Sequence, residues 1–420
     1  MSNGLGFVDY LFLYCMISIW VMLFVNIVLM IGGYLYYLKT LKMNLDEPLQ
    51  EYPTVSVLVP AHNEEKVIGQ TVNALIALDY PRDKLEIIVI NDNSSDRTGE
   101  ILAEIQRKNP GVNLIVLTTD KITGGKGKSG ALNNGYLRST GELLAVYDAD
   151  NTPERNALKY LVHTLSRDDK LGAVIGKFRT RNKTKNMLTK FINIETLGFQ
   201  WMVQAGRWQL FNLCTIPGKN FIVRKKLIEE MGGWDTKAIA EDTEISFRLY
   251  RLGYKIQYMP LSVTWEQEPE TVKVWMKQRS RWVKGNVYVL VKNFKLMFSK
   301  EFRHVRFDLL YFSSVYFLFL SSAIISDVIF ILGACNLITY NIAGNTVLLW
   351  ILAYLVFVLE MAIALSMEKG ESNAKNIGLV ALMYFTYCQL WLIVALKGVW
   401  QYIKDSVLGL EAKWYKTERF

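Results

Sequence analysis

The hydrophobic and polar positions divide the chain into membrane-type segments at both ends and a soluble part between them. Residues 7–38 are almost uninterrupted apolar sequence, with only Asp9 charged near the start. This stretch is too long for a signal-peptide core, and it has the length of one spanning helix with an interfacial start. Lys39 and Lys42 follow directly, and basic residues flank the cytoplasmic ends of spans. We therefore expect the next segment to be cytoplasmic.

The carboxyl-terminal part returns to membrane-type sequence. Three apolar stretches there are each long enough to span a bilayer, at residues 309–332, 347–365 and 377–396. The uncharged loop 336–344 is expected outside, and the loop 367–375, with charges of both signs, inside. Three spans would leave the tail outside, although its basic residues are typical of a cytoplasmic tail: Lys397, Lys404, Lys413, Lys416 and Arg419. Either one segment is re-entrant or interfacial, or the amino-terminal stretch crosses differently.

The soluble part alternates between strand-type and helix-type patterns. Apolar runs predict strands at residues 54–61, 85–92, 112–119, 143–150 and 171–179. Residues 62–78 indicate a loop followed by a helix, and helical patterns also cover residues 191–213, 239–252 and 274–286. Strands that alternate with helices indicate parallel βαβ units, and such sheets bind ligands at the carboxyl ends of their strands.

The stretch ELLAVYDADN, residues 142–151, places two carboxylates at one of these strand ends. Its apolar run at 143–146 leads into Asp148 and Asp150. In an extended backbone, residues i and i+2 point to the same side, so the two carboxylates would face one way. Such a pair suits Mg²⁺ or Mn²⁺ bridging to substrate phosphates. A polar turn after a core strand is the alternative.

Other polar residues gather at the predicted strand ends, namely His62, Asn63, Glu64, Asp92 and Lys128. Because these ends share one edge of the sheet, we expect a single site there. The nearby glycine-rich run GGKGKSG at 124–130 is not a Walker A loop, since Ile122 stands where that motif needs glycine. A flexible loop that carries Lys126 and Lys128 toward a diphosphate and a mobile surface loop both remain open.

The helix predicted at 239–252 begins with Glu241 and Asp242 and ends with arginines, as the helix dipole favours. Its spacing puts Ile245, Leu249 and Leu252 inward. The two acids could be a capping pair, worth about 1 kcal/mol. They could also supply a general base held near an acceptor hydroxyl.

The helix predicted at 274–286 carries Gln278, Arg281 and Trp282 on one face, because residues at i, i+3 and i+4 are neighbours. An arginine suits a leaving diphosphate, and an indole suits the apolar face of a sugar ring. The alternative is a basic amphipathic helix on a membrane surface. In that case the apolar side chains in the interface would be Trp275, Val283, Val287 and Leu290.

Composition agrees with this division. The chain has 420 residues, 51% of them hydrophobic, and a net charge of +9. In a membrane protein this excess indicates cytoplasmic Lys and Arg beside the spans. Nucleic-acid binding is the other explanation, but no nucleic-acid-binding motif is present, so we expect no such partner. The four cysteines have no metal-ligand spacing and are expected to be packing residues.

Together these motifs resemble the processive, membrane-embedded family 2 glycosyltransferases, which include cellulose, chitin, hyaluronan and poly-N-acetylglucosamine synthases. The matching motifs occur in order: PAHNE at 60–64, Asp92 within INDNSSD, GK..ALN at 127–133, DAD at 148–150, ED at 241–242 and QRSRW at 278–282. They cover about residues 54–286. LGAVIGKFRTRNK at 171–183 and the overall size look most like bacterial poly-β-1,6-N-acetylglucosamine synthases.

The resemblance implies roles for individual residues. Glu64 and Asp92 would hold the uridine of a UDP-sugar with Lys128 nearby, and Asp148 and Asp150 the diphosphate and its Mg²⁺ or Mn²⁺. Asp242 would deprotonate the acceptor hydroxyl. The remaining substrate-binding residues would be Glu241, Gln278, Arg281 and Trp282. The reaction would be an inverting transfer to a growing polysaccharide, without a protein nucleophile.

The resemblance also implies an architecture: an α/β fold with a GT-A type, Rossmann-like mixed sheet in a cytoplasmic domain, flanked by transmembrane α-helices. The expected parts are a transmembrane segment at 1–42, the glycosyltransferase domain at 50–290, an amphipathic interfacial segment at 283–306, transmembrane helices at 307–400 and a basic tail at 401–420. The implied location is the bacterial inner membrane, with several spans in the lipid bilayer.

The sequence departs from the family pattern in three places. His62 stands where many relatives have tyrosine, so stacking on uracil is put in doubt. The acidic motif reads AED instead of TED, which leaves Asp242 intact. No PilZ-like domain follows the spans, so we expect any cyclic-di-GMP control to come through an accessory subunit.

Other functions stay open at this point. The sugar could be N-acetylglucosamine, glucose as in a cellulose-type synthase, or two sugars in alternation. A non-processive enzyme could act on a lipid acceptor, although the Gln-x-x-Arg-Trp motif marks processive members of the family. A catalytically dead scaffold would have lost some of the metal or base carboxylates, and none is missing here.

Overall fold

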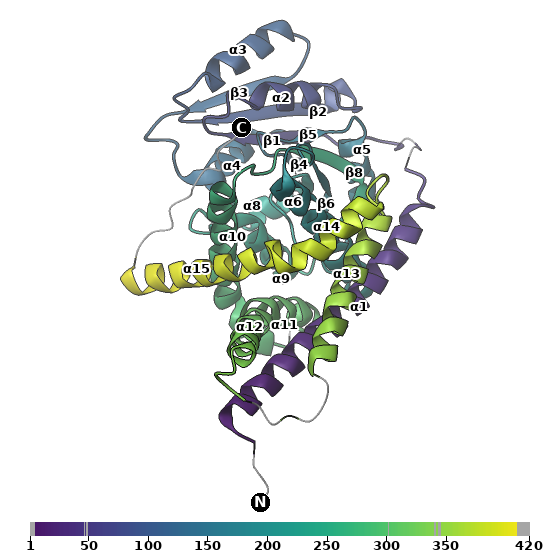
Figure 1. Ribbon diagram of the computed structural model, residues 1–420. Helices are drawn as coiled ribbons and strands as arrows, with labels where there is room; N and C mark the ends of the chain where they lie inside the picture. Colours follow the sequence, from purple (N-terminus) through teal and green to yellow (C-terminus); the bar gives the residue numbers. More distant parts are fainter. Residues whose placement is uncertain are drawn as a thin grey trace, which may run out of the picture.

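A mixed β-sheet with helices on both faces forms the upper part of the molecule in Figure 1, and long helices form the lower part. The computed structural model describes residues 5–409 except 46, 48, 301, 340–341 and 343–345, and it leaves the side chains of residues 304 and 346 undescribed. Of the predicted basic tail, residues 410–420, with Lys413, Lys416 and Arg419, lie outside the described part.

The described strands form one sheet in the order β3-β2-β1-β4-β7-β6-β8-β5. Their bounds are β1 Val55–Ala61, β2 Leu85–Asp92, β3 Leu114–Thr119, β4 Leu143–Val146, β5 Thr152–Pro153, β6 Leu171–Thr180, β7 Phe221–Arg224 and β8 Lys255–Glu266. β1 to β4 pair in parallel as the sequence predicted, and the antiparallel β7 between β4 and β6 makes the sheet mixed. The predicted α/β class with a mixed sheet is confirmed.

Burial of the parallel strands agrees with their composition. All eight residues of β2 are buried, including Glu86 and Asp92, since helices cover both faces. The fourth predicted strand is shorter than expected, because β4 ends at Val146 and Asp150 lies in a turn. β5, β7 and β8 were not predicted.

The helices that belong to the sheet domain (residues 55–293) are α2 Ile68–Ile76, η1 Arg82–Lys84, α3 Thr98–Lys108, α4 Gly127–Arg138, α5 Ala157–Ser166, α6 Met187–Gly198, η2 Phe199–Ala205, α7 Gly206–Phe211, α8 Lys225–Glu230, α9 Glu241–Arg251 and α10 Val272–Asn293. The predicted helix 191–213 is thus interrupted by η2, a π-helical segment. The other helices are α1 Phe7–Thr40, η3 Phe294–Phe298, η4 Arg303–Val305, α11 Arg306–Ser313, η5 Ser314–Phe319, α12 Leu320–Ala334, α13 Thr346–Ser366, α14 Ala374–Phe385 and α15 Tyr387–Leu408.

The first long helix, α1, packs backbone to backbone on the sheet domain through glycines. A Cβ added at Gly33 would lie 2.0 Å from the carbonyl oxygen of Trp201, and one at Gly206 would lie 2.2 Å from that of Leu29. Side chains are therefore excluded at this contact. Toward the carboxyl end of α1, the Tyr36 hydroxyl donates a 2.5 Å hydrogen bond to the backbone carbonyl of Tyr258 in β8. α1 is consequently fixed to η2, α7 and the sheet.

Among the described residues, three helical stretches are long and apolar enough to cross a membrane: α1, the continuous run from Arg306 to Ala334, and Val347–Ser366 of α13. The predicted span at 377–396 is bent by 43° at Thr386, between α14 and α15, so it is either a broken span or a re-entrant segment. Figure 1 shows α15 running across the molecule, below the sheet and above α11 and α12. This geometry favours the re-entrant or interfacial solution that the sequence left open.

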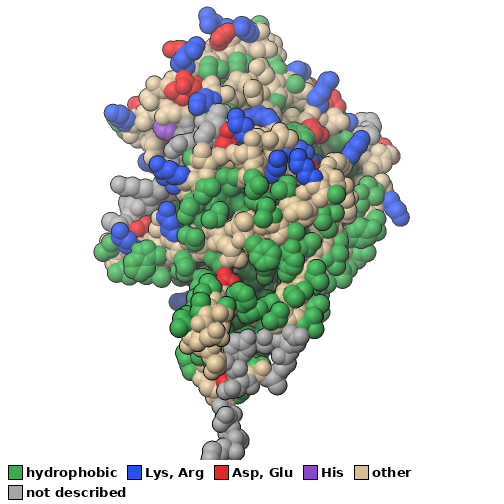
Figure 2. Space-filling model, in the orientation of Figure 1, with side chains coloured by type: hydrophobic (Ala, Val, Ile, Leu, Met, Phe, Trp, Pro, Cys, Tyr) green, Lys and Arg blue, Asp and Glu red, His purple; other side chains and the backbone are tan. Residues whose placement is uncertain are grey.

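α15 lies on α10. A Cβ at Gly398 would approach the Cβ of Val283 to 2.6 Å, and Lys284 forms an ion pair with Asp405. The apolar side chains expected to face a membrane interface are instead buried by protein, namely Trp275, Val283, Val287 and Leu290. Figure 2 shows hydrophobic side chains over the lower part of the molecule and Lys and Arg over the upper part.

The turn between α13 and α14 is held on the sheet domain by buried ion pairs. Glu368 accepts from Lys177 at 2.7 Å and Arg179 at 2.5 Å. Glu371 accepts from Arg179 at 2.9 Å and Lys183 at 2.5 Å. The basic segment after residue 176 therefore connects β6 to the membrane-type helices.

The cysteines only partly match the expectation of packing. Cys15 and Cys214 are buried and Cys388 is half-buried, whereas Cys335 is exposed after α12, which contradicts a packing role for it.

Candidate active site

One cavity of about 2220 Å³ lies below the carboxyl ends of the parallel strands and continues to the membrane-type helices. All the site residues expected from the sequence line it, namely Glu64, Asp92, Lys128, Asp148, Asp150, Glu241, Asp242, Gln278, Arg281 and Trp282. The structure therefore brings together residues that lie more than 200 positions apart in the chain.

The glycine-rich loop wraps around Asp92, the last residue of β2. Asp92 Oδ1 accepts hydrogen bonds from Thr119 Oγ1 at 2.7 Å and from the backbone N–H of Gly125 at 2.9 Å. A Cβ at Gly124 would lie 2.2 Å from the same oxygen, so only glycine fits. His62 Nδ1 donates to the Asp92 carbonyl oxygen at 2.6 Å. These contacts favour a binding loop over a mobile surface loop.

Glu64 is positioned by contacts between the loops that follow β1 and β2. Its backbone N–H donates to Thr98 Oγ1 at 2.8 Å. The preceding Asn63 adopts a positive φ of 55°, and its side-chain oxygen accepts from the backbone N–H of Ser95 at 2.7 Å. Glu64 is buried beside the cavity as a result.

Lys128 joins the two acidic motifs. Its ammonium lies 2.6 Å from Asp148 Oδ1 and 3.5 Å from Glu241 Oε1, and it donates to the Gly218 carbonyl oxygen at 2.6 Å. Burial alone would lower the pKa of Lys128, but the carboxylates of Asp148 and Glu241 outweigh burial and raise it. A permanent cation therefore stands between the two motifs.

A turn, and not the strand, directs Asp148 and Asp150 into the cavity. Asn151 closes that turn, since its side-chain oxygen accepts from the Asp148 N–H at 3.1 Å and its own N–H donates to the Asp148 carbonyl at 3.0 Å. We predicted that an extended backbone would point Asp148 and Asp150 to the same side. The backbone there is not extended, although both residues line the cavity.

The donor set at this turn fits a hard divalent ion. In the described part of the chain, no group of three or more His, Cys, Asp or Glu side chains could hold a metal by itself. Mg²⁺ is commonly held by one or two carboxylates, with substrate phosphates and water completing its shell. Asp148 and Asp150 provide such a pair on the cavity wall.

Asp242 stands in the first turn of α9, where its Oδ1 accepts from the backbone N–H of Thr243 at 2.7 Å. The loop before β7 crosses directly over it. Gly218 there has a φ of +80°, and a Cβ at this position would lie 2.8 Å from Asp242 Oδ2 and 3.2 Å from Lys128 Nζ. A side chain at Gly218 would thus occupy the space beside the carboxylate.

Burial raises the pKa values of both acids of this motif. For Asp242, burial is the largest cause, and it outweighs the opposing effect of Lys128. For Glu241, burial raises the pKa to about 7, with Lys128 opposing and Asp242 adding to the rise. We expected the helix entrance to favour the ionised form of Asp242, but burial has the larger effect.

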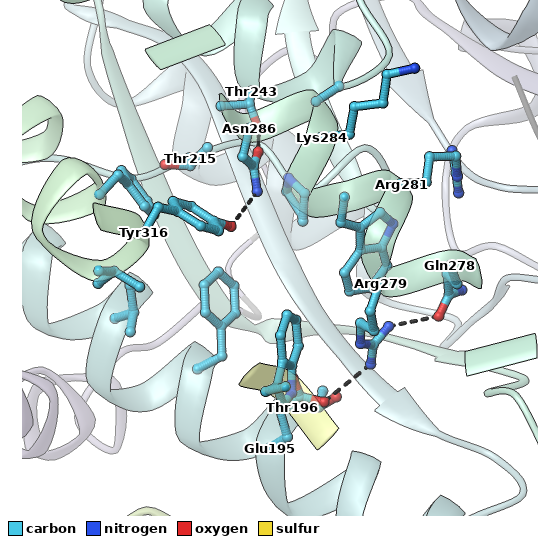
Figure 3. A pocket seen from close by; sticks show the side chains of 18 of the residues that line it. Glu195, Thr196, Thr215, Thr243, Gln278, Arg279, Arg281, Lys284, Asn286 and Tyr316 are labelled. Atoms are coloured by element: carbon cyan, nitrogen blue, oxygen red, sulfur yellow. Dashed lines mark hydrogen bonds and ion pairs between the residues drawn. The ribbon is translucent and has the colours of Figure 1, made fainter. Parts of the chain in front are cut away.

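α10 presents the predicted trio together with a residue that the sequence analysis missed. Arg279 is 2% exposed, and its guanidinium lies 4.0 Å from the ring centroid of Trp282. It also donates to Gln278 Oε1 at 2.7 Å and to Glu195 Oε2 at 3.1 Å, as Figure 3 shows. Trp282 is 36% exposed and lines the cavity. Arg279 therefore supports the indole from behind.

Glu195 on α6 connects this cluster to α15. The Tyr387 hydroxyl donates to Glu195 and accepts from Trp275 Nε1 at 2.9 Å. α6, α10 and α15 thus meet beside Trp282. About one turn further along α10, Asn286 accepts from the Thr243 hydroxyl at 3.1 Å and donates to the Tyr316 hydroxyl at 2.8 Å (Figure 3).

Comparison with known proteins assigns the family. The family model described as "Glycosyltransferase like family 2" matches residues 53–285, more than half of the chain. The chain belongs to the family 2 glycosyltransferases. It is 49% identical to the "Probable glycosyltransferase YdaM" of Bacillus subtilis, over 98% of both chains. It is 32% identical to the "Poly-beta-1,6-N-acetyl-D-glucosamine synthase" of Staphylococcus aureus (strain COL), over 64% of this chain and 65% of that protein.

A solved structure supports the fold of this glycosyltransferase. The mannosyltransferase PcManGT from Pyrobaculum calidifontis aligns with a TM-score of 0.61 at 23% identity, over 90% of this chain and 99% of that one. At this identity the likeness concerns the fold, and it confirms the predicted GT-A type.

The glycosyltransferase site has a further acidic wall that the sequence did not reveal. Glu266 ends β8 and pairs with Lys219, and both line the cavity. Burial raises the pKa of Glu266 to about 8, against the effect of Lys219 and with contributions from Glu268 and Asp150. The acid-rich run WEQEPE at 265–270 was the available signal, but β8 had not been predicted.

Proposed function

We propose that this family 2 glycosyltransferase is processive and inverting, and that it polymerises a β-linked polysaccharide from UDP-N-acetylglucosamine and moves it across the membrane. The observation that carries the proposal is the single cavity, which extends from Asp148 and Asp242 to side chains of α1, α12 and α13. The name of the Staphylococcus aureus relative supports the choice of sugar. A polymer could leave the site along this cavity without entering solvent.

In this proposal the donor binds at the strand ends. Glu64 and Asp92 hold the uridine, and the glycine-rich loop fixes Asp92 for that contact. Lys128 neutralises the acids next to the diphosphate. Asp148 and Asp150 would hold Mg²⁺ or Mn²⁺, since GT-A enzymes commonly use a divalent metal and PcManGT was solved with Mn²⁺. When bound, such an ion stabilises the charge that develops on the leaving diphosphate.

Transfer then requires one base and one displacement. Asp242 accepts the proton of the acceptor hydroxyl, whose oxygen forms a bond to the anomeric carbon on the face opposite the diphosphate. The bond from that carbon to the UDP oxygen breaks, UDP leaves with its electron pair, and the configuration inverts. A raised pKa suits Asp242 to this task, because a base works best when its pKa is near the working pH.

The acceptor end of the polymer would lie on α10. The Trp282 indole offers an apolar plate to the sugar ring, and Arg281 lies on the same helix near the departing diphosphate. Gln278 and Glu241 complete the contacts to substrate. We further propose that the sheet domain is cytoplasmic and that the long helices lie in the inner membrane of a bacterium.

The test is product size in proteoliposomes that contain the purified protein. Each of UDP-N-acetylglucosamine, UDP-glucose and a mixture with UDP-glucuronate is supplied in radiolabelled form. We expect long polymer from UDP-N-acetylglucosamine alone, inside the vesicles, and none from Asp242→Asn. Polymer from UDP-glucose alone would identify a cellulose-type synthase. A single sugar attached to extracted lipid would show that the enzyme is non-processive.

A further inference from the structure

The membrane part of the cavity carries polar side chains from three different helices. Asn26 of α1, Asp327 of α12 and Glu360 of α13 all line it, among aromatic residues such as Trp350 and Phe357. Polar and ionisable groups inside spanning helices are costly, and they usually mark the path of a ligand. Because each helix contributes one group, the feature belongs to the cavity and not to one helix.

Two of these side chains have buried oxygens that nothing in the described part of the chain satisfies. Glu360 is only 4% exposed, and its Oε1 has no hydrogen-bond partner there. Asn26 Oδ1 is likewise buried and has no hydrogen-bond partner in the described part of the chain. Buried polar atoms in native proteins almost always have a partner, so each exception requires an explanation. An occupant of the cavity that donates hydrogen bonds would supply it.

Glu360 lies close to where a product would leave the acceptor site. The next residue, Met361, packs on α6, since a Cβ at Gly198 would lie 2.8 Å from Met361 Sδ. α6 also carries Glu195, the residue that holds Arg279 behind Trp282. The membrane polar group and the proposed sugar plate are thus joined through one helix and line one cavity.

We propose that Asn26 and Glu360, with Asp327 lining the same cavity, bind an uncharged sugar chain by accepting hydrogen bonds from its hydroxyl and amide groups as it passes. This inference rests on the proposed function and specifies its product. A polyprenyl chain has no donors and would leave both oxygens unpaired. A uronate-containing chain would bring its carboxylates beside Asp327 and Glu360. A neutral hexose or N-acetylhexosamine polymer avoids both penalties.

The test compares variants at two adjacent positions of α13 in proteoliposomes supplied with UDP-N-acetylglucosamine or UDP-glucose, each with and without UDP-glucuronate. Glu360→Leu keeps the bulk and removes the acceptor oxygens, whereas Glu360→Gln keeps one. Leu359→Ala is the control, because Leu359 is on the same helix but 59% exposed and away from the cavity. UDP affinity, product length and melting temperature are measured for each.

We expect Glu360→Leu to bind UDP as wild type does and to shorten the product by roughly tenfold. This change corresponds to about 1.4 kcal/mol for a hydrogen-bond donor of the sugar chain that is left without an acceptor. Glu360→Gln should recover most of the length, and Leu359→Ala should match wild type. Full-length product from Glu360→Leu, or equal shortening in all variants, overturns this inference alone. A need for UDP-glucuronate also overturns it. A wild type that only transfers single sugars to lipid overturns the proposed function as well.

Discussion

The two ends of the cavity are built in different ways. At the donor end, Asp92 is the last residue of β2 and Asp148 comes two residues after β4, and their partners Gly125 and Asn151 are supplied by short loops at the same edge of the sheet. At the acceptor end, contacts join distant helices: Arg279 is 84 positions from Glu195, which is 192 positions from Tyr387. The donor end is therefore set by strand order, and the acceptor end by how helices pack.

This difference has a functional consequence. In the proposed function, the donor must bind in one geometry at every turnover, and a rigid sheet edge would provide it. The proposed acceptor changes with every added sugar, and its plate would rest on α6, which packs on α13, and on α15. Variants at the two ends should accordingly have separable effects, on transfer at one end and on product length at the other.

The largest effect is expected from Asp242→Asn, at the junction of the two ends. The N-cap of α9 is Ala240, so Asp242 is not the cap that the sequence allowed. Its structural contact is the Thr243 N–H, which an Asn oxygen can also accept, so a purely structural role predicts a folded, active variant. Loss of a general base predicts normal UDP affinity with transfer reduced about 10²–10⁴-fold. Polymer synthesis, UDP affinity and melting temperature of the reconstituted variant distinguish the two. Activity within about threefold of wild type would leave Asp242 with a purely structural role in the first turn of α9.

The pH dependence of wild type sharpens this assignment. A base must be ionised, and burial raises the pKa of Asp242, so protonation disables it at a higher pH than an ordinary aspartate. The rate should therefore fall as the pH falls through that raised pKa. Glu241, with a pKa of about 7, adds a second titration near neutrality. A rate that stays constant down to pH ~4, the range of an unperturbed aspartate, would contradict the base role.

The next largest effect is expected at the donor end. Asp148→Asn or Asp150→Asn should reduce transfer by about 10²-fold or more, since a metal supplies several kcal/mol of charge stabilisation. UDP affinity should lose its dependence on Mn²⁺, which calorimetry with and without the ion measures directly. Glu142→Gln, an exposed carboxylate just before β4, is the control and should behave as wild type. Undiminished turnover in either aspartate variant would rule out the metal assignment.

The sequence predicted the donor end better than the acceptor end, because local strand patterns set the donor end and long-range helix packing sets the acceptor end. Strands β1 to β4 follow from local apolar runs, and their parallel order brings Glu64, Asp92 and Asp148 to one edge. β7 and β8 were missed, so Glu266 was missed with them. Glu195 and Tyr387 belong to no local pattern, because only the tertiary packing of α6 and α15 gives them a role.

A smaller effect, confined to the acceptor end, is expected from Trp282→Ala. Removing the indole takes away the plate for the sugar ring, and aromatic contacts of this kind contribute about 0.5–1.5 kcal/mol. Product length should fall up to about tenfold while UDP affinity is retained. Trp282→Phe keeps an aromatic face, so its product length should lie between those of wild type and Trp282→Ala. A collapse of UDP affinity with product of normal length would place Trp282 at the donor end instead.

The smallest effect is expected from Tyr387→Phe, which tests whether α15 contributes to the acceptor end at all. The change removes one oxygen, leaves Trp275 Nε1 without its 2.9 Å acceptor and leaves Glu195 with Arg279 as a donor but without the Tyr387 hydroxyl. Leaving buried polar groups unpaired costs about 1–3 kcal/mol of stability, so the melting temperature should fall. If Tyr387 has only a structural role, the melting temperature should fall and the product length should not change. If Glu195 and Arg279 hold Trp282 in place, product length should also fall by roughly twofold to fivefold, less than in Trp282→Ala, because the indole itself remains.

Tyr14→Phe is the control variant. It removes a comparable hydroxyl, bonded to Ser321 at 2.7 Å between membrane-type helices, and should lower stability without changing product length. Equal product lengths for the two variants would show that α15 acts only as a support for α10.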